Sequence, residues 1–295
     1  MNFVVEHQKT KSQLPLYNKS MDGILVINKP AGMTSFDVIA KLRKKIGQKK
    51  FGHAGTLDPE ASGVLVVLAG KATRILPYIT DGDKRYIAQI ELGKQYDTDD
   101  IFGTIEKESP INRDFLFESV LQSFKGKLHQ RVPKASAKKV NGKKLYEYLR
   151  EGKEVPVVYS DVEVYDIHSL DPDRLEFEVH CSSGTYIRSI CRDFGEKTQN
   201  CAAMSALQRI QANGFTIDEA QDLDSENWTV YPIDRLLDYP HLQAPNPADV
   251  LNGKTIRLET EYDEVLLYDQ DRLLALYKRK NPQRDWFGCE RGLWS

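Results

Sequence analysis

The spacing of apolar and polar side chains predicts strands and helices in mixed order between residues 21 and 230. Apolar runs bounded by Gly or Pro, and runs that alternate apolar with polar residues, predict strands at 24–29, 63–70, 84–93, 161–170 and 174–184. The pattern predicts helices at 36–47, 111–124, 142–152 and 186–198, the first with Ser35 as its N-cap and Gly47 as its stop. Since strands outnumber helices, we expect an α+β domain built on a largely antiparallel mixed sheet.

The composition changes after residue 230. Four prolines fall within 231–250, which suits a linker. Beyond it, short apolar runs predict strands at 253–259, 264–269 and 273–280. Residues 1–20 show no packed pattern. We therefore expect a flexible extension at 1–20, a main domain at 21–230, and a linker with a small β-rich module at 231–295.

Composition and cysteine usage narrow the class of protein. With 40% hydrophobic and 28% charged residues, the 295-residue chain has the composition of an ordinary soluble protein. No apolar run approaches the roughly 20 residues that span a bilayer, and the polar first twenty residues lack the apolar core of a secretion signal. We therefore expect a cytoplasmic protein without a membrane partner. The cysteines form no Cys-x-x-Cys pair and no zinc-knuckle arrangement with a histidine, which predicts reduced structural thiols and no metal site.

The net charge is only −2, but the basic residues are clustered. Six of the ten residues from Lys41 to Lys50 are basic and none is acidic. Eight of the twenty residues from Lys125 to Lys144 are basic, again without an acid. Such segregation suits a face that binds a polyanion, because each phosphate contact releases a counterion. The alternative is two solvated surface segments, but two such runs make nucleic acid a candidate partner.

The fourteen residues from Gly52 to Leu65, GHAGTLDPEASGVL, place one acid in an unusual setting. Gly52 and Gly55 allow a close approach of the backbone and a positive φ, and Pro59 biases Asp58 away from the helical conformation. We therefore expect a turn that presents the Asp58 carboxylate as a candidate catalytic group. The alternative is an aspartate that bonds only to its own turn.

This stretch resembles the signature of the bacterial tRNA pseudouridine-55 synthases, the TruB family. Four further segments match that family in order, at 27–39, 83–93, 136–148 and 181–195, so that the resemblance extends from Gly23 to about Phe215. It implies a catalytic domain of the pseudouridine-synthase fold, with an RNA-clasping insertion at about 109–155. It also implies that the enzyme isomerises uridine 55 in the T-loop of tRNA, and residues 231–295 are weakly similar to the RNA-binding module of the family.

The resemblance also implies a role for individual residues. Asp58 would be the nucleophile, Tyr86 would lie against the target base, and Arg188 would pair with the carboxylate. The further implied contacts are Tyr186 and Leu207 lining the pocket, Lys29 and Pro30 bracing the site, His53 stacking on RNA, and Lys138, Lys139, Lys143 and Lys144 on the RNA backbone. Taken alone, these residues have ordinary alternatives as sheet tyrosines, a surface helix charge, a core leucine and a turn histidine.

The chemistry of the implied reaction suits these residues. Forming pseudouridine breaks the glycosidic bond, turns the uracil and rejoins it to the ribose through C5. A carboxylate can attack C6 of the base or C1′ of the ribose, and both remain open. A guanidinium partner favours the ionised carboxylate, and the base must be extruded from its loop. No cofactor and no metal is required.

The chain departs from the family pattern at two places. Family members usually have a Pro-Pro pair and an aromatic residue before Ser-Ala, where this chain has Val132-Pro133 and Ala135. The usual Ala-His-Leu and Arg-Arg are replaced by Ala202-Ala203-Met204 and Gln208-Arg209. These changes affect the packing of an RNA loop more than catalysis.

We expect a monomer that binds the T-stem-loop of tRNA without an obligatory protein partner. Three other functions stay open: a non-catalytic RNA-binding or RNA-folding protein, a pseudouridine synthase of ribosomal RNA, and a nucleoside hydrolase. The basic stretch followed by a helix favours tRNA over ribosomal RNA.

Overall fold

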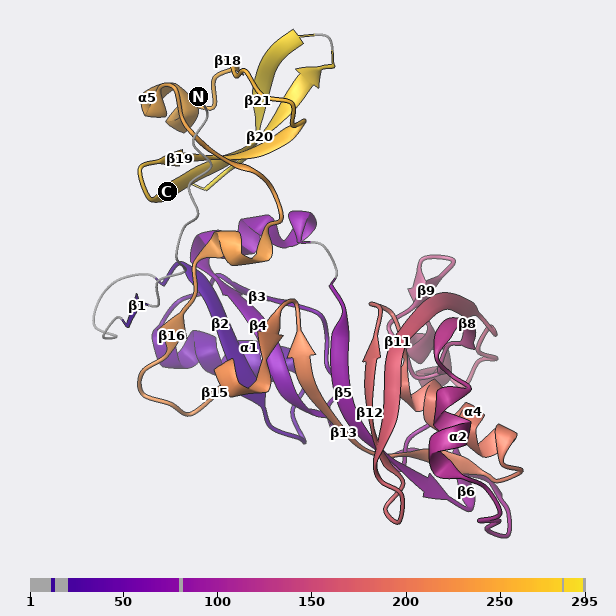
Figure 1. Ribbon diagram of the computed structural model, residues 1–295. Coiled ribbons are helices and arrows are strands. Elements are labelled where there is room, and N and C mark those ends of the chain that lie inside the picture. The colour runs from indigo at the N-terminus through magenta and orange to yellow at the C-terminus, as the bar shows by residue number, and fades with distance from the viewer. Residues whose placement is uncertain (1–11, 14–20, 80–81, 283, 294–295) are drawn as a thin grey trace.

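The computed structural model describes residues 12–13, 21–79, 82–282 and 284–293, and Figure 1 shows two parts of unequal size. The larger part is built on a ten-stranded sheet and the smaller on a five-stranded sheet. The predicted α+β class with a largely antiparallel mixed sheet is confirmed. In the described ranges, no helix combines the length and apolar character needed to cross a bilayer. The prediction for 1–20 falls outside the described residues, apart from β1 (Ser12–Gln13), which pairs with β16 (Thr229–Val230).

The main sheet runs in the order β15-β2-β4-β13-β5-β12-β11-β8, with β3 beside β4 and β14 beside β13. Only β4 with β13 and β15 with β2 are parallel among these described pairs. The strands are β2 (Gly23–Lys29), β3 (Phe51–Ala54), β4 (Ser62–Ala69), β5 (Lys84–Leu92), β8 (Gly126–Arg131), β11 (Tyr159–Asp171), β12 (Glu176–Cys181), β13 (Ala202–Ala212), β14 (Phe215–Thr216) and β15 (Gln221–Asp222).

A short parallel contact joins the two halves of this sheet. β4 and β13 pair only at Ser62 with Gln208 and at Gly63 with Arg209. Gly63 has φ +106°, and a Cβ there would lie 2.2 Å from the backbone oxygen of Arg209, so only glycine fits. The segment that precedes β4, residues 55–61, therefore lies at the seam between the two halves.

Helices cover each half of the sheet. α1 (Ser35–Ile46) packs Val38, Ile39 and Leu42 against β2 and β4. Its N-cap is Thr34 rather than the predicted Ser35, because the Thr34 side chain accepts from the Asp37 N–H in a capping box. The predicted stop at Gly47, in the left-handed conformation, is confirmed. α2 (Phe117–Gln122) and α4 (Ile187–Lys197) pack on the other half.

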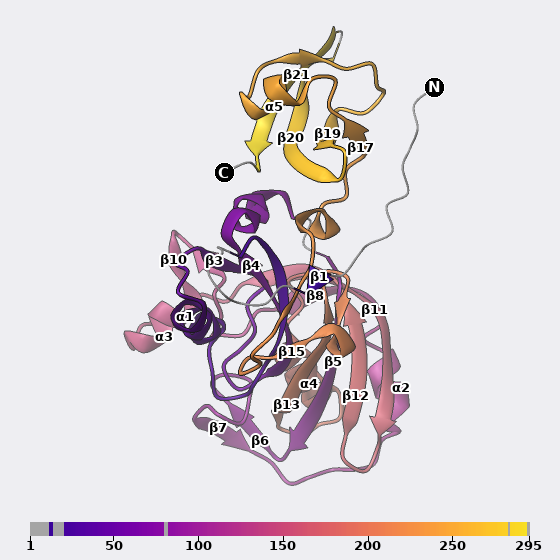
Figure 2. The same cartoon turned by 90° about the vertical axis from the view of Figure 1, so that its left-hand side faces the viewer.

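Short elements complete the larger part. They are η1 (Gly70–Tyr78), β6 (Lys94–Tyr96), β7 (Ile105–Glu108), β9 (Lys139–Val140), β10 (Lys143–Lys144), α3 (Leu145–Arg150), η2 (Ile217–Glu219) and η3 (Ile233–Leu236). β9 and β10 form a hairpin that leads directly into α3. Figure 2 shows this hairpin on the side of the molecule that carries α1 and β3.

In this part, one strand was missed and one helix was predicted too long. The sequence pattern gave no strand at 202–212, where β13 lies at the centre of the sheet, because two register shifts interrupt its alternation. The predicted helix at 111–124 is limited to α2. Its first residues form a loop instead, since the Asn112 N–H donates to Asn200 and the Asn112 side chain accepts from the Asp114 N–H.

The smaller part has the sheet order β17-β19-β20-β21-β18. Its elements are β17 (His241–Gln243), α5 (Pro247–Leu251), β18 (Ile256–Arg257), β19 (Glu264–Asp269), β20 (Arg272–Asn281) and β21 (Arg284–Gly292). The three predicted strands are present, and β17 and β21 were not foreseen. Leu266 and Leu276 share one buried cluster with Ile24 and Val66 of the main sheet, and the Tyr268 hydroxyl donates to Asp234 at 2.7 Å. The two parts therefore share a core.

Candidate functional site

The loop that carries Asp58 connects β3 to β4 and is held by Arg209 from β13. Arg209 is fully buried, and its guanidinium donates to the carbonyls of Gly55, Thr56 and Val64 at 3.1, 3.2 and 2.8 Å. Gly55 takes φ +85°, as expected, whereas Gly52 lies within β3 and does not have a positive φ. A buried guanidinium with three carbonyl partners fixes the entry of the loop.

Lys29, at the end of β2, holds the other side of the loop. Its ammonium is fully buried and donates to the carbonyls of Pro30, Met33 and Pro59 at 2.9, 2.6 and 2.9 Å. Burial lowers the pKa of Lys29 to about 8, although nearby carboxylates, including Asp58, act in the opposite direction. Lys29 thus bonds to backbone carbonyls around the loop, and one of these carbonyls belongs to Pro59, the residue after Asp58.

The first turn of α1 fixes the middle of the loop. The buried Ser35 hydroxyl accepts from the Leu57 N–H at 3.0 Å and donates to the Leu57 carbonyl at 3.1 Å. Residues on both sides of Asp58 are therefore bonded to buried groups from three elements. A loop fixed in this way presents its side chain in one position, as a catalytic group requires.

The Asp58 carboxylate faces Arg188 at the start of α4. Arg188 Nε lies 3.0 Å from Asp58 Oδ2, and the arginine side chain is 7% exposed while the aspartate is 39% exposed. The guanidinium also donates to the carbonyls of Thr98 and Ala135, and Asp100 Oδ2 lies 3.5 Å from its Nη1. Arg188 is therefore a fixed partner for Asp58 and not the exposed helix charge of the alternative interpretation.

Two neighbouring contacts position the start of α4. The buried Arg192, one turn after Arg188, donates to Asp99 at 2.6 Å, and burial raises the pKa of Asp99 despite this partner. Gln130 of β8 accepts from the Tyr186 N–H at 2.8 Å and donates to the Tyr186 carbonyl at 3.0 Å. The backbone around Tyr186 and Arg188 is thereby held in place.

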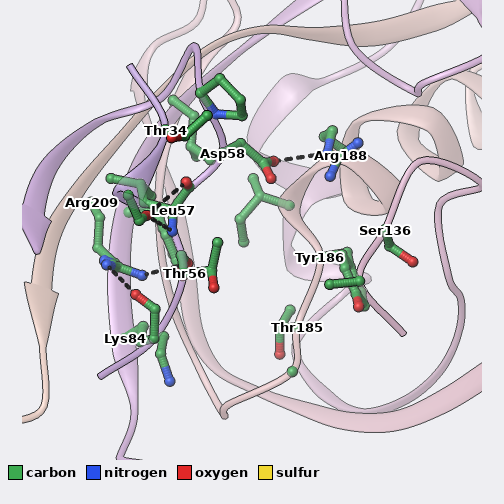
Figure 3. A pocket seen from close by; sticks show the side chains of 18 of the residues that line it. Thr34, Thr56, Leu57, Asp58, Lys84, Ser136, Thr185, Tyr186, Arg188 and Arg209 are labelled. Carbon is green, nitrogen blue, oxygen red and sulfur yellow. Dashed lines mark hydrogen bonds and ion pairs between the residues drawn. The ribbon is translucent and has the colours of Figure 1, made fainter. Parts of the chain in front are cut away.

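A cavity of about 660 Å³ opens beside the Asp58–Arg188 pair. Figure 3 shows the two side chains pointing toward each other at its edge. Its lining includes the residues that the resemblance assigned to catalysis, to the pocket wall and to RNA stacking, namely Asp58, Tyr86, Arg188, His53, Tyr186 and Leu207. Lys29 and Pro30, which were expected to brace the site, do not line it. A second cavity of about 290 Å³ shares Asp58, Arg188 and Leu207 with the first.

Tyr86 and His53 both line the cavity. Tyr86 of β5 lies opposite Arg209 across the sheet, and burial raises its pKa to about 12, so that it stays a neutral aromatic. Burial, followed by the charge of Arg209, lowers the pKa of His53, which keeps it neutral near pH 7. Its Nδ1 has no hydrogen-bond partner among the described residues. Both rings therefore present uncharged surfaces to a ligand.

The basic stretch forms another wall of the cavity. Ser136 and Tyr146 line it from either side of the β9–β10 hairpin, which carries Lys138, Lys139, Lys143 and Lys144. The run contains no acid of its own, but acids from other segments pair with three of its lysines, as in Lys125–Asp166, Lys134–Glu106 and Lys143–Glu151.

Several residues of this arrangement were not foreseen as functional. They are Ser35, Asp99, Asp100, Gln130, Arg192 and Arg209. Nothing in their local sequence distinguishes them, because each acts through a partner far away in the chain. At the departure from the family pattern, Ala135 contributes its backbone carbonyl to Arg188, so this contact does not depend on the side chain.

The chain is similar in sequence to known pseudouridine synthases. Residues 43–187 match the family described as TruB family pseudouridylate synthase (N terminal domain). A tRNA pseudouridine synthase B of Caldanaerobacter subterraneus subsp. tengcongensis is 40% identical over 262 residues, which cover 85% of this chain and 92% of that protein. The chain belongs to the TruB family. A further tRNA pseudouridine synthase B, of Lactobacillus johnsonii, is 38% identical and covers 88% of this chain and 95% of its own length.

Solved structures support the same fold. The crystal structure of a Cbf5–Nop10–Gar1 complex matches with a TM-score of 0.64 at 21% identity, over 97% of this chain and 94% of that one. An H/ACA RNP bound to a substrate RNA containing 2′-deoxyuridine matches with a TM-score of 0.62 at 19% identity, over 97% and 95%. The resemblance to TruB synthases is confirmed, and this TruB-family protein is a pseudouridine synthase, an isomerase.

Proposed function

We propose that this TruB-family enzyme isomerises uridine 55 in the T-loop of tRNA, with Asp58 as its nucleophile. The observation that carries the proposal is the Asp58 carboxylate at the edge of the larger cavity, with Oδ2 paired to Arg188. Within the described chain, no hydrogen bond is made to Oδ1. The names of the two relatives, both tRNA pseudouridine synthase B, support tRNA as the substrate.

In the proposed reaction, Oδ1 attacks C1′ of the ribose or C6 of the uracil and the C1′–N1 bond breaks. The uracil turns within the cavity and a C1′–C5 bond forms. This bond displaces Asp58 from C1′ in the first route, whereas in the second the Asp58–C6 bond breaks by elimination as C5 loses its proton. The hydrogen of C5 leaves as a proton, and N1 gains one. The product is an isomer of the substrate, so no oxidant, reductant or group donor is consumed.

The walls of the cavity suit the handling of a detached uracil. Tyr86 and Tyr186 supply aromatic surfaces and Leu207 an apolar one. A base held between such groups is shielded from water that would otherwise capture the sugar. The target must leave its loop to reach Asp58, and single-stranded loops are the part of RNA whose bases can be extruded. His53 is proposed to stack on the RNA, which its neutral ring allows.

The β9–β10 hairpin is proposed to clasp the RNA backbone. Lys138 and Lys139 are exposed. The Nζ of Lys144 lies 5.4 Å from the ring centroid of Tyr146, which lines the cavity. A backbone held there would keep the extruded nucleotide in the cavity. We propose that the protein acts as a monomer without a protein partner.

Mapping of pseudouridine in a tRNA transcript treated with the purified protein tests the proposal. The expected result is a single new pseudouridine at position 55, formed without nucleotide, nicotinamide or added metal. Modification at another tRNA position or only in a ribosomal RNA fragment would contradict the assigned substrate. RNA binding without any pseudouridine would contradict the activity.

A further inference from the structure

An aromatic side chain that the proposed reaction does not use stands at the edge of the larger cavity. Phe36 is 63% exposed although it lines this cavity. It follows Ser35 on the first turn of α1, where Ser35 points inward to Leu57 of the Asp58 loop. Phe36 therefore stands close to the catalytic loop but faces outward. A large exposed apolar group beside a cavity indicates a binding surface.

The ring of Phe36 is supported by a fixed guanidinium. Arg43, two turns along α1, lies with its Cζ 5.6 Å from the ring centroid. Its Nη2 donates to the carbonyl of Phe51 at 3.2 Å, which ties it to the first residue of β3. The same strand carries His53 on the cavity wall. Phe36 and Arg43 thus form a positioned flat surface that is both aromatic and cationic.

The basic residues of the run at 41–50 favour an anionic partner for the surface formed by Phe36 and Arg43. Lys41, Lys44, Lys49 and Lys50 are all exposed, and no acidic side chain in the described part of the chain forms an ion pair with them. Lys45 differs, because its ammonium donates to the carbonyls of Asp224 and Ser225. Asp37, next to Phe36 in the sequence, is ionised and accepts two hydrogen bonds from Thr34 in the cap of α1. Within the basic run at 41–50, Arg43 is the residue that contacts the ring of Phe36.

We propose that Phe36, supported by Arg43, is a stacking platform for one unpaired base of the RNA loop beside the extruded uridine. The inference rests on the proposed function. A nucleobase offers a flat face to the ring, and its own backbone places phosphates among the exposed lysines. Arginine adds a cation–π contribution to such a stack. An apolar protein segment could pack on the Phe36 ring, but it would offer no negative charge to the exposed lysines of the run at 41–50.

The first experiment measures the Kd of a T-stem-loop RNA for Phe36 variants. Phe36→Ala and Phe36→Leu should weaken binding by about 5- to 150-fold, the range expected when one base stack is removed. Phe36→Trp should bind like the wild type, because it keeps an aromatic face. Leu116→Ala, at a residue that is 79% exposed and lines neither cavity, is the matched control and should have no effect. If Phe36→Leu bound the RNA as tightly as the wild type, the proposal that Phe36 stacks on a base would be wrong.

The second experiment identifies the base. RNAs with an abasic site at one loop position at a time, other than the target, are titrated with wild type and Phe36→Ala. At one position the weakening caused by Phe36→Ala should disappear, since no base is left to stack. An equal weakening at every position would overturn the proposal. Pseudouridine formation by the wild type on the intact RNA is read separately, so a failure of the proposed function is distinguished from a failure of the platform.

Discussion

Two buried cations at the site bind backbone carbonyls. Arg209 and Lys29 each donate to three carbonyls on or beside the loop that carries Asp58. Burying a cation is costly unless its protons are paired, and each of these has its partners. These contacts fix the position of the Asp58 carboxylate. Substitutions at Arg209 and at Lys29 test their roles.

Arg209→Lys keeps the charge but cannot reach all three carbonyls. The loop should shift, and a displacement of about 1 Å at a reacting group can reduce turnover by roughly 100-fold. RNA affinity should change little, because it depends on many phosphate contacts. Single-turnover kinetics and RNA titration on the folded variant check this prediction. A folded variant with wild-type kcat would show that Arg209 does not position the loop.

Lys29 makes stability depend on pH. Its pKa is about 8 in the folded chain and 10.5 in the absence of burial, so between these values the unfolded chain binds more protons. Stability therefore rises with pH in this window for the wild type, and Lys29→Met lacks that contribution. The wild type should gain stability relative to Lys29→Met from pH 7.5 to about 10 in urea unfolding, by the linkage of protonation to folding. A constant difference would mean that burial does not lower this pKa.

At the scale of elements, local patterns predicted the strands β2, β4, β5, β11 and β12 and the helices α1, α3 and α4. Most of these segments have regular alternation, apolar runs or clear stop residues, although β11 also contains two register shifts. β13 was missed because its two register shifts break the alternation, and because a buried Arg209 looks like a surface charge. The strand β3 was taken as part of a glycine turn, since Gly52 conceals its extended backbone.

Site residues could be predicted from the sequence only where they lie in a segment that matches the family. Asp58, Tyr86 and Arg188 come from segments that match the family, and the structure brings them to one cavity. Gln130 and Asp99 could not be found in this way. Their partners Tyr186 and Arg192 lie more than fifty residues away, so the contacts depend on the folded sheet.

The lysines of the β9–β10 hairpin are expected to bind phosphates of the tRNA backbone. Alanine at Lys138, Lys139, Lys143 and Lys144 should weaken tRNA binding and flatten the plot of log K against log salt, by up to about 0.7 to 0.9 for each phosphate that the variant no longer binds. Lys143 should contribute least, since Glu151 already pairs with it. Salt titrations of binding give the slope.

The matched control replaces four basic residues that line neither cavity, Lys94, Lys107, Arg174 and Lys197. Its slope should equal that of the wild type. If the hairpin variant also kept the wild-type slope, the hairpin would not clasp the RNA backbone.

At the scale of the whole molecule, the two sheets are joined through one buried cluster. Leu266 and Leu276 of the smaller part pack with Ile24 and Val66 of the larger, and Arg74 of η1 donates to the carbonyl of Gly292. The smaller part therefore cannot separate without exposing apolar surface. This predicts that both parts unfold together.

Calorimetry should show a single transition for the wild type. Leu266→Ala should lower that transition as a whole, because deleting a buried leucine side chain costs about 2–5 kcal/mol. Leu170→Ala, at a side chain that is 44% exposed, is the control and should leave it in place. Two separate transitions, of which Leu266→Ala shifts only one, would show that the parts unfold independently.

At the scale of the whole enzyme, Asp58 is proposed to carry out the isomerisation, and tritium release from tRNA labelled at C5 of uridine tests this role most directly. Asp58→Asn preserves the size of the side chain but removes the anionic nucleophile. It should release almost no label while still binding tRNA, whereas the wild type releases label without any cofactor. Release by Asp58→Asn at a rate near that of the wild type would contradict the account, and Asp58 would then be only a turn residue.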